Sequence, residues 1–214
     1  MDRETLTVDV LLKAYELGVF PMSESRDDTD VFWVDPRKRG IIPIGGFHFS
    51  RSLARRIRKG GFRVSVNEDF AGVMQACADR PETWISETIF DIYAQLHALG
   101  HAHSMEIRDE SGLIGGVYGV TLGAAFFGES MFSRRTDGSK IALAYLMDRL
   151  QQAGFLLFDT QFITPHLQRL GGIEIPRSTF HDYLEEAIAT KADFTTPPLP
   201  ASPQALLQRN TQTS

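Results

Sequence analysis

The stretch GHAHSMEIRDESGLIGGVYGVTLGAAFFGESMFS, residues 100–133, decides the fold of this chain. It contains three apolar runs separated by the short sequences ESG and TLG, and the first run, HSMEI, alternates polar and apolar residues. Alternation with a period of two, interrupted by tight turns, is typical of neighbouring antiparallel strands. We therefore predict an antiparallel meander of three strands.

The third predicted strand carries one carboxylate, Glu129, on an otherwise apolar face. Because side chains alternate across a strand, that face should also carry Ala125, Phe127, Met131 and Ser133. An unpaired buried charge is costly, so Glu129 is either a structural acid with a partner or the polar end of a pocket. The spacing alone leaves both interpretations open.

Composition indicates an ordinary globular chain. With 214 residues, 43% of them hydrophobic and 23% charged, it is long enough for one core and a small appended subdomain. The single cysteine, Cys77, excludes an intramolecular disulfide framework and a Cys-rich zinc site, and it fits a reducing compartment such as the cytoplasm. A net charge of -5 argues against a protein that coats nucleic acid, but it permits a local basic patch.

We expect neither a signal peptide nor a membrane span, because residues 1–20 contain acids and no uninterrupted apolar run. Residues 1–35 are predicted to form a small N-terminal subdomain, with a helix that Thr7 or Asp9 caps, and a short aromatic strand. A polar loop at residues 23–30 should separate these two elements.

The main body is predicted to span residues 36–192. Asn67 and Ser86 are expected to cap two of its helices, and a closing helix should begin at about Ser178. The remaining segment, residues 193–214, is rich in Pro and Thr, and we predict a flexible tail there.

A further helix is predicted after Ser50, and it has a basic face. Its cations recur at i+4, i+7 and i+8 and therefore share one side of the helix: Arg51, Arg55, Arg58 and Lys59. Charge runs are usually solvated faces, whereas a cluster of cations also suits phosphate groups. Both interpretations remain open.

A strand, loop, helix and strand follow one another from residue 125 to residue 163, which indicates a crossover unit. The loop before the helix offers backbone N–H groups to an anion. In the last strand, Asp159 and Gln161 are two residues apart and should point to the same side. Ligands tend to bind where strands end at a crossover, so this polar pair is a candidate site.

Seven motifs resemble, in order, those of the leucyl/phenylalanyl-tRNA-protein transferase family. They span about residues 7–180 and read LLKAYELGVFPM, ETWIS, LHALGHAHSMEI, LIGGVYGV, FFGESMFS, SKIAL and FDTQFITPHLQRLGGIEIPR. The resemblance implies an α+β chain with a GNAT-like acyltransferase fold. That is a mixed, mostly antiparallel sheet flanked by helices, after a small N-terminal subdomain.

The resemblance also implies a cytoplasmic enzyme without cofactor or metal. It would move Leu or Phe, less readily Met, from charged tRNA to the α-amino group of proteins that begin with Arg or Lys. This would mark the acceptor for degradation through the bacterial N-degron route. The implied partners are Leu-tRNA, Phe-tRNA and such acceptor proteins, with no membrane.

By the same resemblance, Asp159 and Gln161 are the catalytic pair. Aminolysis of an ester needs a neutral amine, a path for its proton and stabilisation of the oxyanion. Asp159 would bind or deprotonate the amine, directly or through Gln161, and Gln161 would orient the reacting groups. The terminal ribose hydroxyl of the tRNA could relay the proton instead. Because the ester is already activated, positioning of the reactants could also supply most of the catalysis.

Further residues match binding positions of the family. The pocket for the incoming side chain would be lined by Val117, Glu129, Met131, Leu143, Leu146 and Phe158. The aromatic residues around the 3′ adenosine would be Tyr15, Trp84 and Tyr93, where each stacked base contributes about 1–3 kcal/mol. The tRNA backbone would contact the basic helix through Arg51, Arg55, Arg58 and Lys59. An ordinary core role remains open for the apolar and aromatic residues.

Two departures from the family pattern lie near the N-terminus. Pro21-Met22 stands where relatives commonly have Pro-Trp, and the tryptophan signature is shortened to Trp33-Val34-Asp35-Pro36-Arg37. The N-terminal contribution to substrate binding is therefore the least certain part of the resemblance. The motifs around Glu129 and Asp159 are intact.

Two other functions fit parts of the sequence. An acyl-CoA-dependent N-acetyltransferase would use the loop with Arg135 and Gly138, but Lys140 occupies a position that needs Gly or Ala. A non-catalytic binder of tRNA or peptides on the same fold is the other alternative. His101 and His103 share a predicted strand face like a metal pair, yet no third ligand is evident, so we predict no metal.

Overall fold

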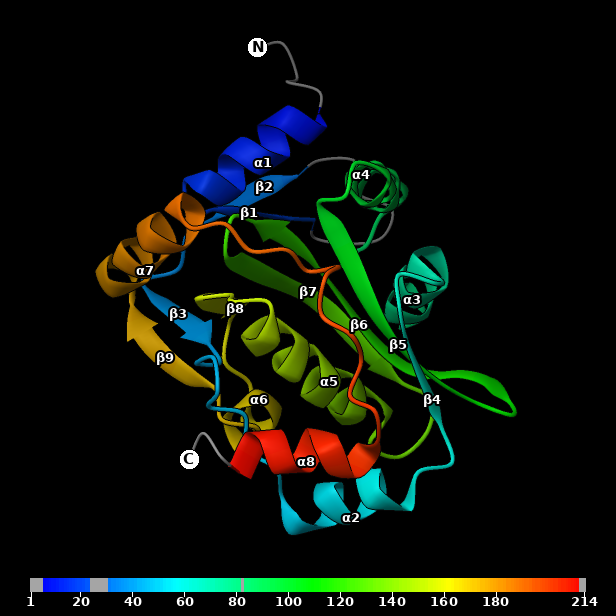
Figure 1. Cartoon of the computed structure of the whole chain (residues 1–214). Coiled ribbons are helices and arrows are strands. Elements are labelled where there is room, and N and C mark those ends of the chain that lie inside the picture. Colours follow the sequence, from blue (N-terminus) through cyan, green and yellow to red (C-terminus); the bar gives the residue numbers. More distant parts are fainter. Residues whose placement is uncertain (1–5, 24–30, 82, 212–214) are drawn as a thin grey trace.

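The computed structural model describes residues 6–23, 31–81 and 83–211 of the chain, so most of the polar loop expected at residues 23–30 lies outside the described residues. Its main feature is a seven-stranded sheet in the order β4-β5-β6-β7-β8-β3-β9 (Figure 1). Only β7 and β8 pair in parallel, and all other neighbours in this sheet are antiparallel.

The predicted meander is confirmed. It forms the middle of the sheet as β5 (Ala102–Asp109), β6 (Gly112–Leu122) and β7 (Ala125–Ser133). The turns after β5 and β6 contain Gly112 at φ 107° and Gly123 at φ 57°. A residue with a Cβ atom avoids these angles, so the two glycines allow the strands to reverse direction tightly.

A β-bulge interrupts β7 at Glu129. Tyr118 pairs with Ser130 and Gly119 pairs with Gly128, which leaves Glu129 without a partner on β6. An extra residue in one strand bends that strand and re-aims the side chains near it. Glu129 therefore has no paired residue on β6, and its side chain is free of the regular alternation of the strand.

The bulge corrects the predicted alternation along β7. Phe127 packs in the core on one face of the sheet, whereas Met131 packs in the core on the other face. The prediction that both share a face with Glu129 is wrong, because the extra residue reverses the alternation. Gly119 permits the bulge, since a Cβ atom there would lie 2.2 Å from the carbonyl oxygen of Phe127.

The other strands of the sheet lie at its two sides: β4 (Arg63–Val66), β8 (Leu157–Gln161), β3 (Lys38–Ile41) and β9 (Ile173–Pro176). A separate antiparallel pair joins β1 (Phe20–Met22) to β2 (Phe32–Val34). The predicted α+β class, with a mixed and mostly antiparallel sheet flanked by helices, is confirmed.

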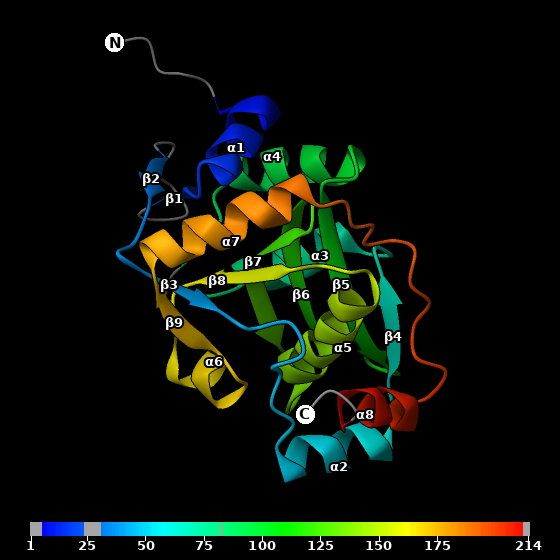
Figure 2. The ribbon, with the colours of Figure 1, turned by 60° about the vertical axis from the view of Figure 1, so that its left-hand side comes forward.

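Helices cover both faces of the sheet (Figures 1 and 2). One apolar core includes residues of α1 (Val8–Glu16), α3 (Phe70–Ala78), α4 (Glu87–Ala98) and α7 (Arg177–Ala189). The core on the other face includes residues of α2 (Arg51–Lys59), α5 (Gly138–Gln152) and α8 (Pro203–Thr211). The short α6 (Pro165–Arg169) lies between β8 and β9 in the sequence.

Three of the predicted helix caps are confirmed, namely Thr7, Ser50 and Ser86. The cap of α3 is Asp69 instead of the predicted Asn67, and its Oδ1 accepts a hydrogen bond from Gly72 N at 3.0 Å. Asn67 has φ 59°, and its side chain lies 2.9 Å from Nδ1 of His103. Asn67 thus links β4 to β5, a contact that local sequence does not reveal.

The C-terminal segment corrects the prediction of a flexible tail. Residues 203–211 form α8, and Leu206 and Leu207 are 1% and 9% exposed in the core with α2 and α5. Phe194 is also buried, and its carbonyl oxygen accepts a hydrogen bond from Arg149 Nη1 at 2.5 Å. Pro and Thr do predict irregular chain, but two adjacent leucines supply enough apolar surface to anchor it.

Leu206→Ala should lower the free energy of unfolding by about 2–3 kcal/mol, because it removes a buried side chain and leaves a cavity. Gln204→Ala, on the exposed side of the same helix, is the matched control and should change it by less than about 0.5 kcal/mol. Urea denaturation measures both. Equal stability of the two variants would show that the segment is a tail without a fixed position.

Candidate active site

The candidate site lies where β7 and β8 stop pairing. Their parallel register runs from Ala125 opposite Leu157 to Phe127 opposite Asp159. Two residues further along each strand stand Glu129 and Gln161, and Gln161 Nε2 donates a hydrogen bond to Glu129 Oε1 at 3.3 Å. A side-chain contact thus replaces the backbone ladder at this point.

Glu129 accepts a second hydrogen bond from a tyrosine of the N-terminal segment. The Tyr15 hydroxyl donates to Glu129 Oε1 at 2.7 Å and lies 2.5 Å from the hydroxyl of Tyr93 on α4. Both tyrosines are 0% exposed, and Glu129 is 9% exposed. The carboxylate therefore has only neutral hydroxyl and amide groups as its hydrogen-bond partners here.

Burial raises the pKa of Glu129 to about 7, and the negative charge of Asp159 adds to this effect. Hydrogen bonds from Tyr15, Tyr93 and Gln161 act in the opposite direction because they stabilise the charged form. The pKa values of Tyr15 and Tyr93 are raised well above their usual range, first by burial and then by the nearby Glu129 charge. The raised pKa makes Glu129 a candidate for proton transfer in this site.

Asp159 lies in a different environment. It is 0% exposed, and its two carboxylate oxygens accept hydrogen bonds from Arg39 Nε at 2.8 Å and Arg39 Nη2 at 2.6 Å. Its Oδ1 also accepts from the backbone N–H of Gln161 at 2.8 Å. Sequence reasoning missed Arg39, although a cation next to the apolar run of β3 was a usable sign of a buried partner.

The apolar residues predicted to line a side-chain pocket lie together. The cluster between the sheet and α5 contains Val117, Met131, Leu143, Leu146 and Phe158. Glu129 is the exception among the predicted lining residues, because its partners Tyr15 and Tyr93 belong to the core on the other face. The bulge at Glu129 explains this separation.

The residues predicted near the 3′ adenosine are not equally accessible. Tyr15 and Tyr93 are fully buried around Glu129, whereas Trp84 is only partly buried against the same core. Trp84 precedes α4 and is the most exposed member of this set. The adenosine role of all three stays a prediction.

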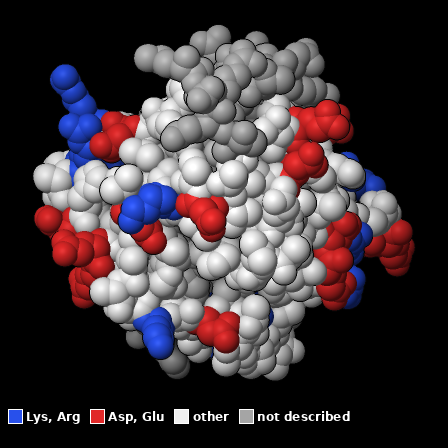
Figure 3. Space-filling model, turned by 90° about the horizontal axis from the view of Figure 1, so that it is seen from above, with Lys and Arg blue, Asp and Glu red and all other residues white. Residues whose placement is uncertain are grey.

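The basic face of α2 is exposed as predicted: Arg51, Arg55, Arg58 and Lys59. Two views place α2 beside α8, at the opposite end of the molecule from α1 and α4 (Figures 1 and 2). The end that carries α1 shows scattered basic and acidic groups instead of a basic patch (Figure 3). A ligand that touches both Trp84 and α2 must extend along the molecule.

Two backbone donors at the start of α5 already have partners within the protein. Gly138 N–H bonds to the carbonyl oxygen of Arg135 at 3.0 Å, and Ser139 N–H bonds to Ser133 Oγ at 3.1 Å. Lys140 is held by Asp137 at 2.6 Å. These contacts argue against the acyl-CoA alternative.

Of the two histidines, His103 lies in β5 and His101 precedes this strand. His103 is buried, its ring stacks on Phe194 with centroids 4.4 Å apart, and burial lowers its pKa to about 4. Among the described residues, no group of three or more His, Cys, Asp or Glu side chains could hold a metal ion. Within residues 6–23, 31–81 and 83–211, no helix is both long and apolar enough to cross a membrane.

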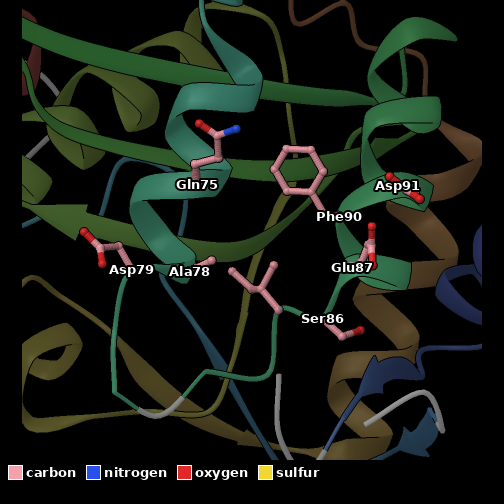
Figure 4. A pocket seen from close by; sticks show the side chains of 8 residues that line it. Gln75, Ala78, Asp79, Ser86, Glu87, Phe90 and Asp91 are labelled. Atoms are coloured by element: carbon pink, nitrogen blue, oxygen red, sulfur yellow. The ribbon is translucent and has the colours of Figure 1, made fainter. Parts of the chain in front are cut away.

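An open cleft of about 740 Å³ lies between α3 and α4 (Figure 4). Its lining includes Phe90, Ile85 and three carboxylates: Asp79, Glu87 and Asp91. None of the predicted site residues lines this cleft, although Trp84 precedes Ile85 in the chain.

Comparison with known proteins identifies the family of this chain. The family model described as leucyl/phenylalanyl-tRNA protein transferase matches residues 41–185, and that of its N-terminal domain matches residues 4–37. A protein of that description from Cereibacter sphaeroides is 63% identical over 214 residues, 100% of each chain. Another, from Ruegeria sp., is 63% identical over 210 residues, 98% of this chain and 100% of the relative. The solved structure of FemX is similar with a TM-score of 0.49 and 13% identity, over 85% of this chain and 73% of that chain.

The protein is an aminoacyltransferase, an enzyme that uses aminoacyl-tRNA. It belongs to the leucyl/phenylalanyl-tRNA protein transferase family, since the family models together match most of the chain and full-length relatives are 63% identical. The resemblance seen in the sequence motifs is confirmed.

Glu129→Gln should change how stability depends on pH. The raised pKa of Glu129 means that the folded protein holds this proton more tightly than the unfolded chain does. The free energy of unfolding should therefore fall by about 3 kcal/mol relative to the Gln variant as pH rises from about 4.5 to about 7, and then level off.

Urea denaturation between about pH 5 and pH 8 measures this difference. Glu110→Gln, which removes an exposed carboxyl from the turn after β5, is the control for the loss of one negative charge. A Glu129→Gln curve parallel to that of the wild type would contradict the raised pKa.

Proposed function

We propose that this enzyme transfers Leu or Phe, and less readily Met, from charged tRNA to the N-terminal α-amino group of proteins that begin with Arg or Lys. The modified protein would then be degraded through the bacterial N-degron route. The family membership and the printed names of the relatives support the tRNA and the aminoacyl groups. The acceptor class comes from the motif resemblance.

The observation that carries the proposal is the Glu129–Gln161 contact at the point where β7 and β8 separate. The Gln161 amide donates to Glu129, so its oxygen remains available to accept a hydrogen bond from the amine of an acceptor. Glu129, with its pKa near 7, can hold or release a proton at the pH of the reaction. This places a polar orienting group beside a titratable acid.

In the reaction, the acceptor nitrogen attacks the ester carbonyl, the C–N bond forms and the ester C–O bond breaks. One proton leaves the nitrogen, and one proton reaches the 3′ oxygen of the tRNA. Gln161 orients the amine, and Glu129 or the neighbouring ribose hydroxyl relays the proton. Because the ester is already activated, positioning carries much of the rate.

Asp159 supports this arrangement without touching the amine. Both of its oxygens are bonded to Arg39, and it accepts the N–H of Gln161, so its effect passes through Gln161. Of the two routes expected from the sequence, direct or through Gln161, this arrangement favours the route through Gln161.

The incoming side chain would contact the apolar cluster beside α5, which contains Met131, Leu143, Leu146 and Phe158. Apolar contacts discriminate modestly, by about 1–3 kcal/mol per methylene, so acceptance of both Leu and Phe is physically reasonable. Methionine is flexible and adapts to irregular shapes, which favours a pocket of mixed preference.

The exposed cations of α2 would contact the phosphate backbone of the tRNA: Arg51, Arg55, Arg58 and Lys59. Such contacts supply affinity that weakens with salt and do not read base sequence. Because α2 and α4 lie at opposite ends of the molecule (Figures 1 and 2), a tRNA that contacts both α2 and Trp84, just before α4, would lie along the molecule.

Gln161→Gly should lower kcat by at least about 10²-fold, because the amide that orients the amine is lost. Stability should change by no more than about 1 kcal/mol, since Gln161 has φ 63° and glycine adopts that conformation freely. The assay uses radiolabelled Leu-tRNA with a peptide that begins with Arg, beside peptides that begin with Asp or Ala.

Asn67→Gly is the matched control, because Asn67 also has positive φ and follows β4, at the far edge of the sheet from β8. Its kcat should equal that of the wild type. Wild-type protein that binds tRNA and labels no peptide would favour the non-catalytic binder. Acetylation of the peptides from acetyl-CoA would favour the acetyltransferase.

A further inference from the structure

Arg39 is the largest side chain that is fully buried, with an exposed fraction of 0%. Its guanidinium lies between two rings, with Cζ 4.6 Å from the centroid of Phe20 and 4.3 Å from that of Phe180. Neither the family motifs nor the mechanism above assigns it a role. A charge buried so completely is kept only when its donors are satisfied.

The donors of Arg39 reach two parts of the site. Nε and Nη2 form a bidentate pair with Asp159, and Nη1 donates to the carbonyl oxygen of Gly18 at 2.9 Å. Gly18 follows α1, the helix that supplies Tyr15. A single planar group thus fixes the end of α1 against β8.

The backbone of β3 pairs with β8 along the edge of β8 that faces away from β7. Gly40 pairs with Gln161 and Ile41 pairs with Asp159, and a register shift falls between the two pairs. A Cβ atom on Gly40 would lie 2.7 Å from the carbonyl carbon of Phe162, so the two chains approach closely here. The figures show β3 beside β8 beneath α7 (Figure 2).

Gln161 adopts an unfavourable backbone angle, φ 63°, immediately after this contact. Such a conformation persists only where its surroundings impose it. The imposing bond is Gln161 N–H to Asp159 Oδ1, and Asp159 is itself immobilised by the fork of Arg39. Arg39 thus holds Asp159, and Asp159 holds the backbone of Gln161. These two contacts direct the side-chain amide of Gln161 toward Glu129.

We propose that Arg39 is a positioning residue for catalysis: it orients Gln161 through Asp159 without contacting the substrate. The inference rests on the proposed function, because Gln161 is the orienting group there. A planar bidentate fork differs from a point charge, so Lys at this position keeps the charge and loses the geometry. Misplacement of about 1 Å in a catalytic group costs up to about 10²-fold in rate.

Arg39→Lys should lower kcat for transfer of Leu to the Arg peptide by about 10- to 10²-fold, while KM for Leu-tRNA changes by less than about two-fold. The loss should vanish in the Gln161→Gly background, where the group that Arg39 orients is absent. Arg39→Lys combined with Gln161→Gly should then match Gln161→Gly alone within about two-fold.

Met74→Ala separates positioning from mere destabilisation, because Met74 is fully buried on α3, a helix that carries none of the proposed site residues. It should keep the wild-type kcat at a temperature where circular dichroism shows it to be folded. Should Arg39→Lys fail to fold, Arg39→Met with Asp159→Leu replaces the ion pair by apolar groups, a change that proteins tolerate. That folded double variant should lose kcat to the same extent.

Wild-type kcat in Arg39→Lys or in the apolar double variant would overturn the inference. An equal loss of kcat from Arg39→Lys in the wild-type and in the Gln161→Gly background would also overturn it. Additive effects of this kind would mean that Arg39 does not act through Gln161. Failure of the wild type to label any peptide would instead reject the proposed function itself. The two results are therefore distinguishable.

Discussion

The ion pair between Arg39 and Asp159 is the constraint on which the site depends. Two opposite charges without solvent contact remain in a core only if nearly every donor and acceptor is satisfied. Here the remaining partner is the carbonyl of Gly18, and the guanidinium faces are covered by Phe20 and Phe180. The N-terminal segment, β3, β8 and α7 meet at this one group. The segment from Tyr15 to Phe20 therefore helps to build the candidate site, and Phe20 also begins the strand pair of β1 and β2.

Irregular backbone creates the site within an otherwise regular sheet. The bulge at Glu129 removes one residue from the ladder of β6, and the left-handed conformation of Gln161 ends the strand on the other side. The two strands consequently stop pairing after Phe127, and side chains occupy the space between them. Bulges and strained residues are common next to active sites because they re-aim side chains that a regular strand would direct elsewhere.

The two buried carboxyls of the site differ in what surrounds them. Asp159 faces a guanidinium, which balances its charge, whereas the partners of Glu129 are the hydroxyl of Tyr15 and the amide of Gln161. Burial therefore raises the pKa of Glu129 to about 7. In the proposed mechanism, Asp159 therefore holds Gln161 in place and Glu129 carries the proton, two roles that different environments give to similar side chains.

The sequence by itself determined the meander, most helix caps and the family, because periodicity, capping residues and motifs are local properties of the chain. It also marked Glu129 and Gln161 as polar groups in apolar strands. Only the tertiary structure decided the bulge, the burial of Leu206 and the partner of Asp159, which stands 120 residues away. A bulge depends on the register of two strands, and a buried ion pair depends on which distant segments pack together. Neither is encoded in the spacing of neighbouring residues.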